Sequence, residues 1–300
     1  MNYDKIKKDY LRKIKRINEL NEYYFDKNSP LVSDSEYDSL KKEILKIEKK
    51  HKSLINKNSP SKIVGFKPSK NFKKVQHTVP MLSLSNAFSE SDLINFEKKI
   101  LNFLNKDKKY VLEYSAEPKI DGISASLNYI NGELITGLSR GDGKEGEDIT
   151  ANLKTIKDIP HKISSKDFPE EIDIRGEVFI QNSDFKKLSN KFANPRNAAS
   201  GSLRQKNSED TKKIPLRFIA YTFGFEKGIK VEKQDEFLHK LSEWGFKTNP
   251  LNKKIQGIKN LMLNYSFIEK KRNTLDFDID GIVYKINDFE LQKRLGNVTN

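Results

Sequence analysis

A lysine and an aspartate two residues apart, Lys119 and Asp121, have the residue types and spacing for chemistry in this 300-residue chain. They lie in the stretch EPKIDGISASLNY, residues 117–129, whose later odd-numbered positions are all apolar. Strand side chains alternate between two faces. The pattern therefore predicts that both charges begin a buried face, unless Gly122 changes the parity. Buried charges cost free energy unless they are paired or take part in chemistry.

Lys119 could act as a nucleophile at this position. Burial and neighbouring cations disfavour the charged form of an amine, and the neutral amine can attack an electrophile. The alternative is an edge-strand lysine that reaches water along its alkyl stem or pairs with Asp121. We expect a poorly solvated Lys119 if the first interpretation is correct.

The composition combines a strong positive charge with few arginines. The formal net charge is +14, which favours binding to nucleic-acid phosphates. A chain rich in Lys and Asn through codon bias would give the same charge without that function. Arginine offers a planar fork suited to phosphate, and four of the nine arginines cluster in one region: Arg140, Arg175, Arg196 and Arg204.

Several classes of site are unsupported by the composition. With no cysteine and four histidines, disulfides and thiolate metal sites are excluded and zinc has few ligands. Oxygen ligands remain, and these suit Mg²⁺. No apolar run approaches the roughly 18 residues of a membrane span, and the N-terminus lacks the apolar core of a secretory signal. We expect a cytoplasmic protein that does not contact a membrane.

The hydrophobic spacing predicts a small helical domain, residues 1–67, before a larger domain, residues 68–300. Two amphipathic helices are predicted over 3–26 and 35–52, with Asp34 as the N-cap of the second. A stretch rich in Asn, Ser, Pro and Lys over 56–72 predicts a linker.

The larger domain is predicted to have an α+β fold, because its strands and helices do not alternate in a regular βαβ rhythm. An Asn-Gly pair at 131–132 predicts a hairpin. The predicted strands are 110–117, 122–130, 133–140, 172–180, 215–225 and 280–286. The predicted helices are 90–104, 181–192, 196–204, 233–243, 255–270 and 288–294.

Five motifs follow one another in a characteristic order: EPKIDG, LSRGDGKEGEDIT, DIRGEVFI, NPRNAASGSLRQ and DFDIDGIVYKIND. In this order they resemble the adenylation region of bacterial NAD-dependent DNA ligases. The Lys-x-Asp-Gly element alone would indicate only the wider covalent nucleotidyltransferases, which include ATP-dependent ligases and mRNA capping enzymes. Two further stretches narrow the resemblance. YYFDKNSPLVSDSEYDSL resembles the module that holds nicotinamide mononucleotide (NMN), and VPMLSLSNAF resembles the entry into the adenylation domain.

The resemblance implies a fold and a reaction. The fold is a helical NMN-binding domain followed by an ATP-grasp-like domain of antiparallel sheets flanked by helices. Lys119 would attack the α-phosphorus of NAD, form enzyme-AMP and release NMN; the full enzyme would pass AMP to the 5′-phosphate of nicked DNA. Asp121 and Asp280 would orient Lys119 or accept its proton, directly or through Mg²⁺ at Asp280. Arg140 and Lys285 would neutralise the developing charge. Turn aspartates and surface cations are the alternatives.

Four more residues are implied to contact the nucleotide. Glu117 would lie near the adenine and Glu177 near the ribose hydroxyls, while Ser83 and Leu84 match a nucleotide-contacting pair. The alternatives are a solvated strand end for Glu117, an ion pair with Arg175 for Glu177, and a core position for Leu84.

Five residues of the small domain match positions that grip NMN: Tyr24, Phe25, Asp34, Tyr37 and Asp38. Asp34, Tyr37 and Asp38 stand at i, i+3 and i+4, hence on one helix face, and suit a cationic planar ring. The alternative is a helix cap plus one core tyrosine. Phe25 stands where the family often carries a hydrogen-bonding ring such as His.

NPRNAASGSLR predicts a helix with Asn194 as N-cap and Pro195 at its first position. By the resemblance, Arg196 and Arg204 would face pyrophosphate or DNA. Surface charges on a helix are the alternative.

Beyond these motifs the family would continue with another lysine motif, an oligonucleotide-binding barrel, a four-cysteine zinc module, helix-hairpin-helix repeats and usually a BRCT domain. We therefore expect a monomeric fragment of a bacterial enzyme that binds NAD and Mg²⁺, self-adenylates slowly at best and does not seal nicked double-stranded DNA alone; zinc would belong only to the remainder. Two alternatives stay open: an ATP-dependent or capping-type nucleotidyltransferase, and a non-catalytic basic module that binds nucleic acid.

Overall fold

The computed structural model describes residues 3–21, 34–56, 72–107, 109–188 and 190–296, together with Tyr23, Val32 and Ser59. Most of the predicted linker, as well as Tyr24 and Phe25, lies outside the described residues. Contacts divide the chain into two units. The first comprises residues 1–83, 140–147 and Asn300, and the second comprises residues 84–139 and 148–299.

The first unit contains two packed helices, α1 (Tyr3–Asn21) and α2 (Asp34–Lys50), followed by a 3-10 turn, η2 (Lys52–Leu54). Their apolar stripes meet at Tyr10, Ile14, Ile17 and Ile44, all buried. Both predicted helices are thus present. Asp34 is the first residue of α2 rather than the residue before it.

A small antiparallel pair also belongs to this unit, β1 (Lys74–Gln76) with β5 (Glu145–Glu147). The sequence did not predict these strands, because three residues are too few for a period-two pattern to emerge.

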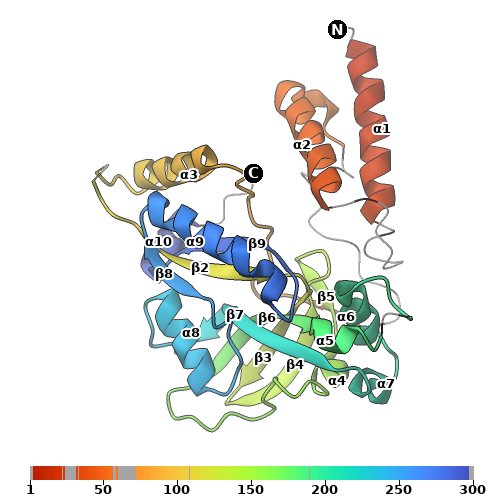
Figure 1. Cartoon of the computed structure of the whole chain (residues 1–300), viewed down its shortest axis with the longest axis vertical. Coiled ribbons are helices and arrows are strands. Elements are labelled where there is room, and N and C mark those ends of the chain that lie inside the picture. Colours follow the sequence, from red (N-terminus) through yellow and green to blue (C-terminus); the bar gives the residue numbers. More distant parts are fainter. Residues whose placement is uncertain are drawn as a thin grey trace. The chain divides into compact units, whose positions relative to one another are not determined.

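The second unit contains two antiparallel sheets, which confirms the predicted α+β class (Figure 1). The three-stranded sheet has the order β8-β2-β9 and comprises β8 (Lys253–Gln256), β2 (Glu113–Ile120) and β9 (Ile279–Ile286). The four-stranded sheet has the order β4-β3-β6-β7 and comprises β4 (Glu133–Ser139), β3 (Ile123–Ile130), β6 (Glu171–Ile180) and β7 (Leu216–Lys227).

The second unit also contains helices and a 3-10 turn. They are α3 (Glu90–Phe103), α4 (Thr150–Leu153), α5 (Asn182–Phe185), α6 (Pro195–Leu203), α7 (Ser208–Lys212), α8 (Gln234–Glu243), α9 (Ile258–Lys271), the 3-10 turn η3 (Arg272–Thr274) and α10 (Phe289–Leu295). Helices α3, α9 and α10 cover one face of the three-stranded sheet through a core that includes Leu101, Tyr114, Leu261 and Ile286. The other face of this sheet is left to carry polar side chains.

The stretch 117–129 is not one strand. It contains the end of β2 and most of β3, which belong to different sheets, so the expectation of a single buried face is wrong. The chain passes between the sheets at Asp121 and Gly122. A Cβ atom on Gly122 would lie 2.3 Å from the carbonyl oxygen of Val178, so only glycine permits this close approach.

Two other predictions need correction, and one is confirmed. The predicted helix 181–192 is reduced to α5, and the predicted helix 255–270 begins only after β8, where Gly257 has a φ of +77°. Asn131 and Gly132 both have positive φ, 50° and 78°, and join β3 to β4 as the hairpin prediction required.

None of the helices in the described ranges is long and apolar enough to cross a membrane.

Candidate functional site

Lys119 lies near the end of β2, opposite Gly281 of β9, and its Nζ atom donates a hydrogen bond to Asp280 Oδ2. The side chains of Lys119 and Asp280 are 44% and 38% exposed. The expectation of a poorly solvated lysine is therefore wrong. A shift in strand register between Lys119 and Ile120 disrupts the ladder where the lysine leaves it, and such irregularities redirect side chains.

Asp121 pairs with a different cation. Its Oδ1 atom accepts a hydrogen bond from Arg196 Nη1, and its backbone N–H donates to the carbonyl oxygen of Asp278 over 2.9 Å. The predicted helix cap that positions Arg196 is confirmed, since Asn194 Oδ1 accepts from the backbone N–H of Asn197 over 2.7 Å. Asp280 and Asp121, the two predicted aspartates, thus each form an ion pair with a basic side chain.

Glu177 of β6 is half-buried and accepts a hydrogen bond from Ser124 Oγ over 2.9 Å. Burial raises the pKa of Glu177 to about 7, against the opposing attraction of Arg196, the Ser124 hydrogen bond and Lys119. Because these charges act on Glu177, it belongs to the same cluster as the two ion pairs. Its hydrogen-bond partner is Ser124, whereas the alternative interpretation placed Arg175 there.

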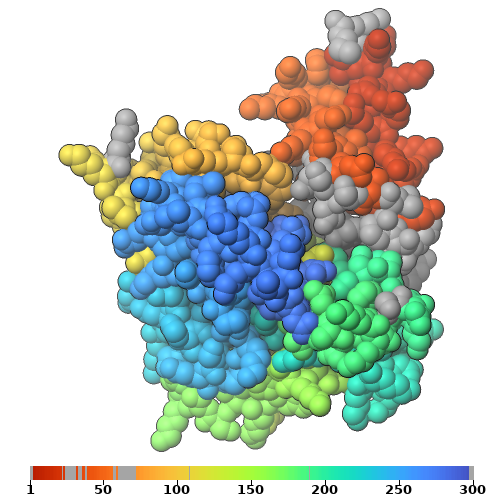
Figure 2. All heavy atoms as spheres, viewed as in Figure 1, coloured from red at the N-terminus to blue at the C-terminus, as the bar shows by residue number. Residues whose placement is uncertain are grey.

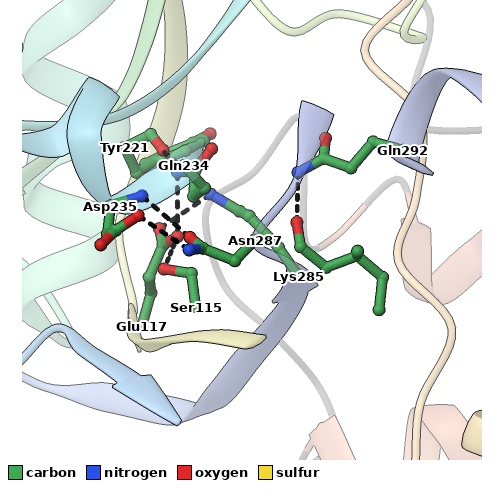
Figure 3. A network of polar contacts seen from close by, with 9 residues as sticks. Ser115, Glu117, Tyr221, Gln234, Asp235, Lys285, Asn287 and Gln292 are labelled. Carbon is green, nitrogen blue, oxygen red and sulfur yellow. Dashed lines mark hydrogen bonds and ion pairs between the residues drawn. The ribbon is translucent and has the colours of Figure 1, made fainter. Parts of the chain in front are cut away.

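Glu117 sits in a buried polar network shown in Figure 3. Its Oε1 atom accepts from Ser115 Oγ over 2.8 Å and from Gln234 Nε2 over 2.9 Å, while Oε2 accepts from Lys285 Nζ over 2.8 Å. Its residue exposure is 4%, so the alternative of a solvated strand end is wrong.

The same network ties the two sheets together. Lys285 Nζ and Gln234 Nε2 both donate to the backbone carbonyl of Tyr221 on β7, over 2.9 and 2.7 Å. Lys285 Nζ also lies 5.3 Å from the centroid of the Tyr221 ring. Lys285 is therefore held by Glu117 and Tyr221. Neither Tyr221 nor Gln234 was a predicted site residue, because nothing local marks a backbone carbonyl or a buried amide as a partner.

The first unit holds Arg140 and Ser83 together. Arg140 Nη2 donates to Ser83 Oγ over 3.1 Å, and its Nε atom donates to the carbonyl oxygen of Met81 over 3.3 Å. The following residue, Leu84, belongs to the second unit and is 59% exposed. A core position for Leu84 is therefore wrong.

The structure describes only part of the predicted NMN grip. Tyr37 donates through its hydroxyl to Asn21 Oδ1 over 2.8 Å and packs against the core between α1 and α2, as the alternative of a core tyrosine predicts. Tyr24 and Phe25, and the side chains of Asp34 and Asp38, lie outside the description.

Arg204 does not join Arg196. It is the C-cap residue of α6, whereas Arg196 lies in the first turn. Eight residues of helix separate them by about 12 Å.

A metal site is not preformed in the described part of the chain, where no group of three or more His, Asp or Glu side chains could hold an ion. Asp280 and Asp121 each face a cation instead. A single carboxylate such as Asp280 can still complete the shell of a Mg²⁺ ion that is bound mainly by water and substrate phosphates.

Comparison with known families covers nearly the whole chain. Residues 69–300 match the family model described as NAD-dependent DNA ligase adenylation domain. Residues 4–65 match the model described as DNA ligase-like, N-terminal NAD+-binding domain.

Individual relatives agree with these matches. A DNA ligase of Pelagibacter ubique is 65% identical over 300 residues, which are 100% of this chain and 44% of the relative. A DNA ligase of Parvibaculum lavamentivorans is 44% identical over 284 residues, 92% of this chain and 40% of the relative. A DNA ligase of Rickettsia bellii is 45% identical over 304 residues, 99% of this chain and 44% of the relative. The chain thus spans less than half the length of these relatives.

Proposed function

Because this chain belongs to the NAD-dependent DNA ligase family, we propose that it performs the adenylation step of NAD-dependent DNA ligation. Residues 1–67 would bind the NMN half of NAD, and residues 68–300 would carry the reaction. In the complete enzyme, the AMP would pass to the 5′-phosphate of nicked double-stranded DNA.

The observation that carries the proposal is the exposed Lys119 amine in contact with Asp280. In the reaction, a nitrogen–phosphorus bond forms between Lys119 Nζ and the α-phosphorus of NAD, and the phosphoanhydride bond to NMN breaks. The amine must lose a proton to attack, and Asp280 already accepts a hydrogen bond from it. The exposure of Lys119 lets the substrate reach the amine.

Arg196 would neutralise charge on the pyrophosphate. It lies in the first turn of α6, where backbone N–H groups also favour anions, and it remains partly exposed beside Asp121. Asp121 would hold the guanidinium in place. Mg²⁺ would arrive with the substrate phosphates and complete its shell at Asp280.

The nucleoside would extend along the face of β2 that carries Lys119 and Glu117, which are two residues apart and so point the same way. Glu117 would lie near the adenine. Glu177, whose pKa lies near neutrality, could donate or accept a hydrogen bond at the ribose hydroxyls.

The remaining assignments rest on the family. They are charge neutralisation by Arg140 and Lys285, nucleotide contacts by Ser83 and Leu84, an NMN grip by Tyr24, Phe25, Asp34, Tyr37 and Asp38, and a DNA contact by Arg204. A monomer in the bacterial cytoplasm is also proposed.

Intact mass spectrometry after incubation with Mg²⁺ and either NAD or ATP tests the proposal. We expect a gain of one AMP with NAD, none with ATP, and none for Lys119→Ala. A gain with ATP alone would indicate an ATP-dependent nucleotidyltransferase. No gain together with no NAD binding by calorimetry would leave only a basic nucleic-acid-binding module.

Asp38→Ala separates the NAD-dependent function from the others. We expect it to abolish adenylation by NAD, because the variant loses a carboxylate from the proposed NMN grip. An unchanged response to NAD would contradict that grip.

A further inference from the structure

A groove of about 530 Å³ lies between α9 and the start of β2, along β8. Glu113 lines it at the start of β2, six residues from Lys119, which corresponds to about 20 Å along a strand. The groove is therefore separate from the proposed adenylation site. Helix α9 runs back along β8, since Asn260 Nδ2 donates to the carbonyl oxygen of Gln256 and Phe267 lies against Lys253.

One side of the groove is a stripe of α9. Asn260, Leu263, Asn264 and Phe267 follow the spacing i, i+3, i+4 and i+7, hence one helix face. Leu263 is 62% exposed and Phe267 is 39% exposed. Figure 2 shows the blue region that includes α9 open to solvent between the gold of α3 and the lighter blue of α8. This apolar surface is available to a ligand.

A buried amide lies in the same stripe. Asn264 is 6% exposed, and its Oδ1 atom has no hydrogen-bond partner in the part of the chain that the structure describes. A buried amide without a partner costs stability. Asn264 lines the groove, so a ligand that supplies a hydrogen-bond donor to Oδ1 would remove this cost.

The other side of the groove is a sheet edge. β8 pairs with β2 on one side, and among the described strands it has no second neighbour. An edge strand presents unpaired backbone N–H and C=O groups, which can pair with an added strand. In Figure 1, β8 lies at the margin of the three-stranded sheet.

The two ends of the groove carry different charges. At one end, Lys253 Nζ and Lys271 Nζ lie 4.9 and 5.0 Å from the centroid of the Phe267 ring. At the other end is the carboxylate of Glu113, opposite Gln256 in the strand register. It already accepts hydrogen bonds from Asn287 Nδ2 and Gln256 Nε2 and lies 3.9 Å from Lys233 Nζ. This arrangement favours an acidic group beside Phe267, where the two lysine ammonium groups lie.

We propose that this groove is a docking site for an extended peptide segment of a partner protein, which adds a strand to β8 and places an acidic side chain between Lys253 and Lys271. The side-chain amide of Asn264 matches a peptide backbone, because a peptide unit has both an N–H donor and a C=O acceptor that an amide can pair with. An apolar peptide side chain would cover Leu263 and Phe267.

Nucleic acid fits the groove less well. A phosphate backbone offers hydrogen-bond acceptors but no donors, so it cannot pair with the backbone C=O groups along the edge of β8. A backbone of phosphates also offers no donor to Asn264 Oδ1. A peptide matches the lysine end of the groove, the open edge of β8 and the buried amide oxygen.

A random library of linear nine-residue peptides displayed on phage tests the proposal with the whole chain as bait and Asn264→Leu as counter-selection. We expect enriched peptides with an acidic residue and alternating apolar residues. The synthetic consensus, labelled with fluorescein, should then bind saturably in fluorescence anisotropy, and Asn264→Leu and Lys253→Glu should each weaken binding at least tenfold. Adenylation by NAD should stay unchanged in both variants, which separates this site from the proposed active site.

A consensus peptide with an N-methylated backbone controls for strand addition and should not bind. The proposal is overturned if no peptide is enriched, if the N-methylated peptide binds equally well, or if both variants bind with unchanged affinity. A different outcome is that a DNA duplex displaces the peptide from the parent chain at 150 mM salt and does not bind the Lys253→Glu variant. That result would assign the groove to nucleic acid.

Discussion

Two ion pairs join the same two strands, β2 and β9, yet they differ in their access to water. Lys119 and Asp280 are roughly 40% exposed, whereas the side chains of Glu117 and Lys285 are 5% and 19% exposed. The exposed pair consists of one hydrogen bond. The buried pair is surrounded by Ser115, Gln234 and the carbonyl oxygen of Tyr221 (Figure 3).

This difference separates a pair that can exchange partners from a pair that is fixed in place. An exposed pair is screened by water and holds its partners weakly, so under the proposed function Lys119 would exchange Asp280 for the substrate. A buried pair cannot lose one partner without leaving an uncompensated charge, so Glu117 and Lys285 hold β2 and β9 against β7. The rigid pair would then keep the reactive pair in position.

The largest expected effect is on the reaction at the exposed pair. Lys119→Arg keeps the positive charge and the contact with Asp280 but removes the nucleophilic amine, because guanidinium remains protonated. We expect adenylation by NAD to fall at least about 10³-fold, which corresponds to about 4 kcal/mol in activation free energy. Single-turnover transfer of labelled AMP from NAD measures this rate. Activity within tenfold of the parent chain would show that Lys119 is not the nucleophile.

The next effect should fall on stability and distinguish the buried pair. Lys285→Met leaves the buried Glu117 carboxylate without its cation, and we expect a loss of about 3 kcal/mol in the free energy of unfolding. Lys119→Met should cost under about 1 kcal/mol, because its pair is exposed. Urea unfolding of both variants measures the difference. Equal losses would remove the distinction between the two pairs.

The sequence predicted the positions of these charges better than their partners. Lys119, Glu117 and Asp280 were found because they lie in ordered motifs. Their neighbours depend on how β2 and β9 pair, and the cross-strand partner of Lys119 lies about 160 residues away in the chain. Two separate strands were predicted on either side of residues 118–121, but nothing in the alternation showed that they belong to different sheets.

Helix predictions show the same limit. Asn194 and Pro195 marked the start of α6 because capping depends on adjacent residues. The predicted helix after residue 181 ends at Phe185, and residues 186–188 continue as turns. Gln234 has no local signal for its bond to Glu117, because such contacts exist only after the sheets have packed.

Glu177 is intermediate in exposure, whereas Lys119 and Asp280 are exposed and Glu117 is buried. Its contribution to the free energy of unfolding should depend on pH. Burial raises its pKa from 4.5 to about 7, so the folded chain binds this proton more tightly than the unfolded chain. The stability from this group is complete below about pH 4.5 and is lost as the pH rises through about 7. We expect Glu177→Gln to equal the parent chain at pH 4 and to exceed it at pH 8, by up to about 3 kcal/mol.

Urea unfolding at both pH values measures this crossover. The variant keeps an acceptor for the Ser124 hydroxyl, so the hydrogen bond serves as an internal control, and Ser124→Ala tests that bond separately. A constant difference between pH 4 and pH 8 would show that Glu177 does not titrate in this range.

The smallest expected effect is the coupling within the exposed pair. In a double-mutant cycle of Lys119→Met and Asp280→Asn, we expect a coupling free energy of about 0.5 kcal/mol that decreases between 50 mM and 1 M salt, because water and ions screen the pair. The same cycle with Glu117→Gln and Lys285→Met should give a larger coupling free energy. Salt should change it little, because this pair is buried. For the rate of adenylation the two pairs should rank the other way. Substitutions in the Lys119–Asp280 pair should slow adenylation more than those in the Glu117–Lys285 pair, because Asp280 would accept the proton of Lys119 and an asparagine there cannot. A strong, salt-independent coupling between Lys119 and Asp280 would mean that the lysine is fixed in place, and the substrate would then have to break a stable ion pair before the reaction.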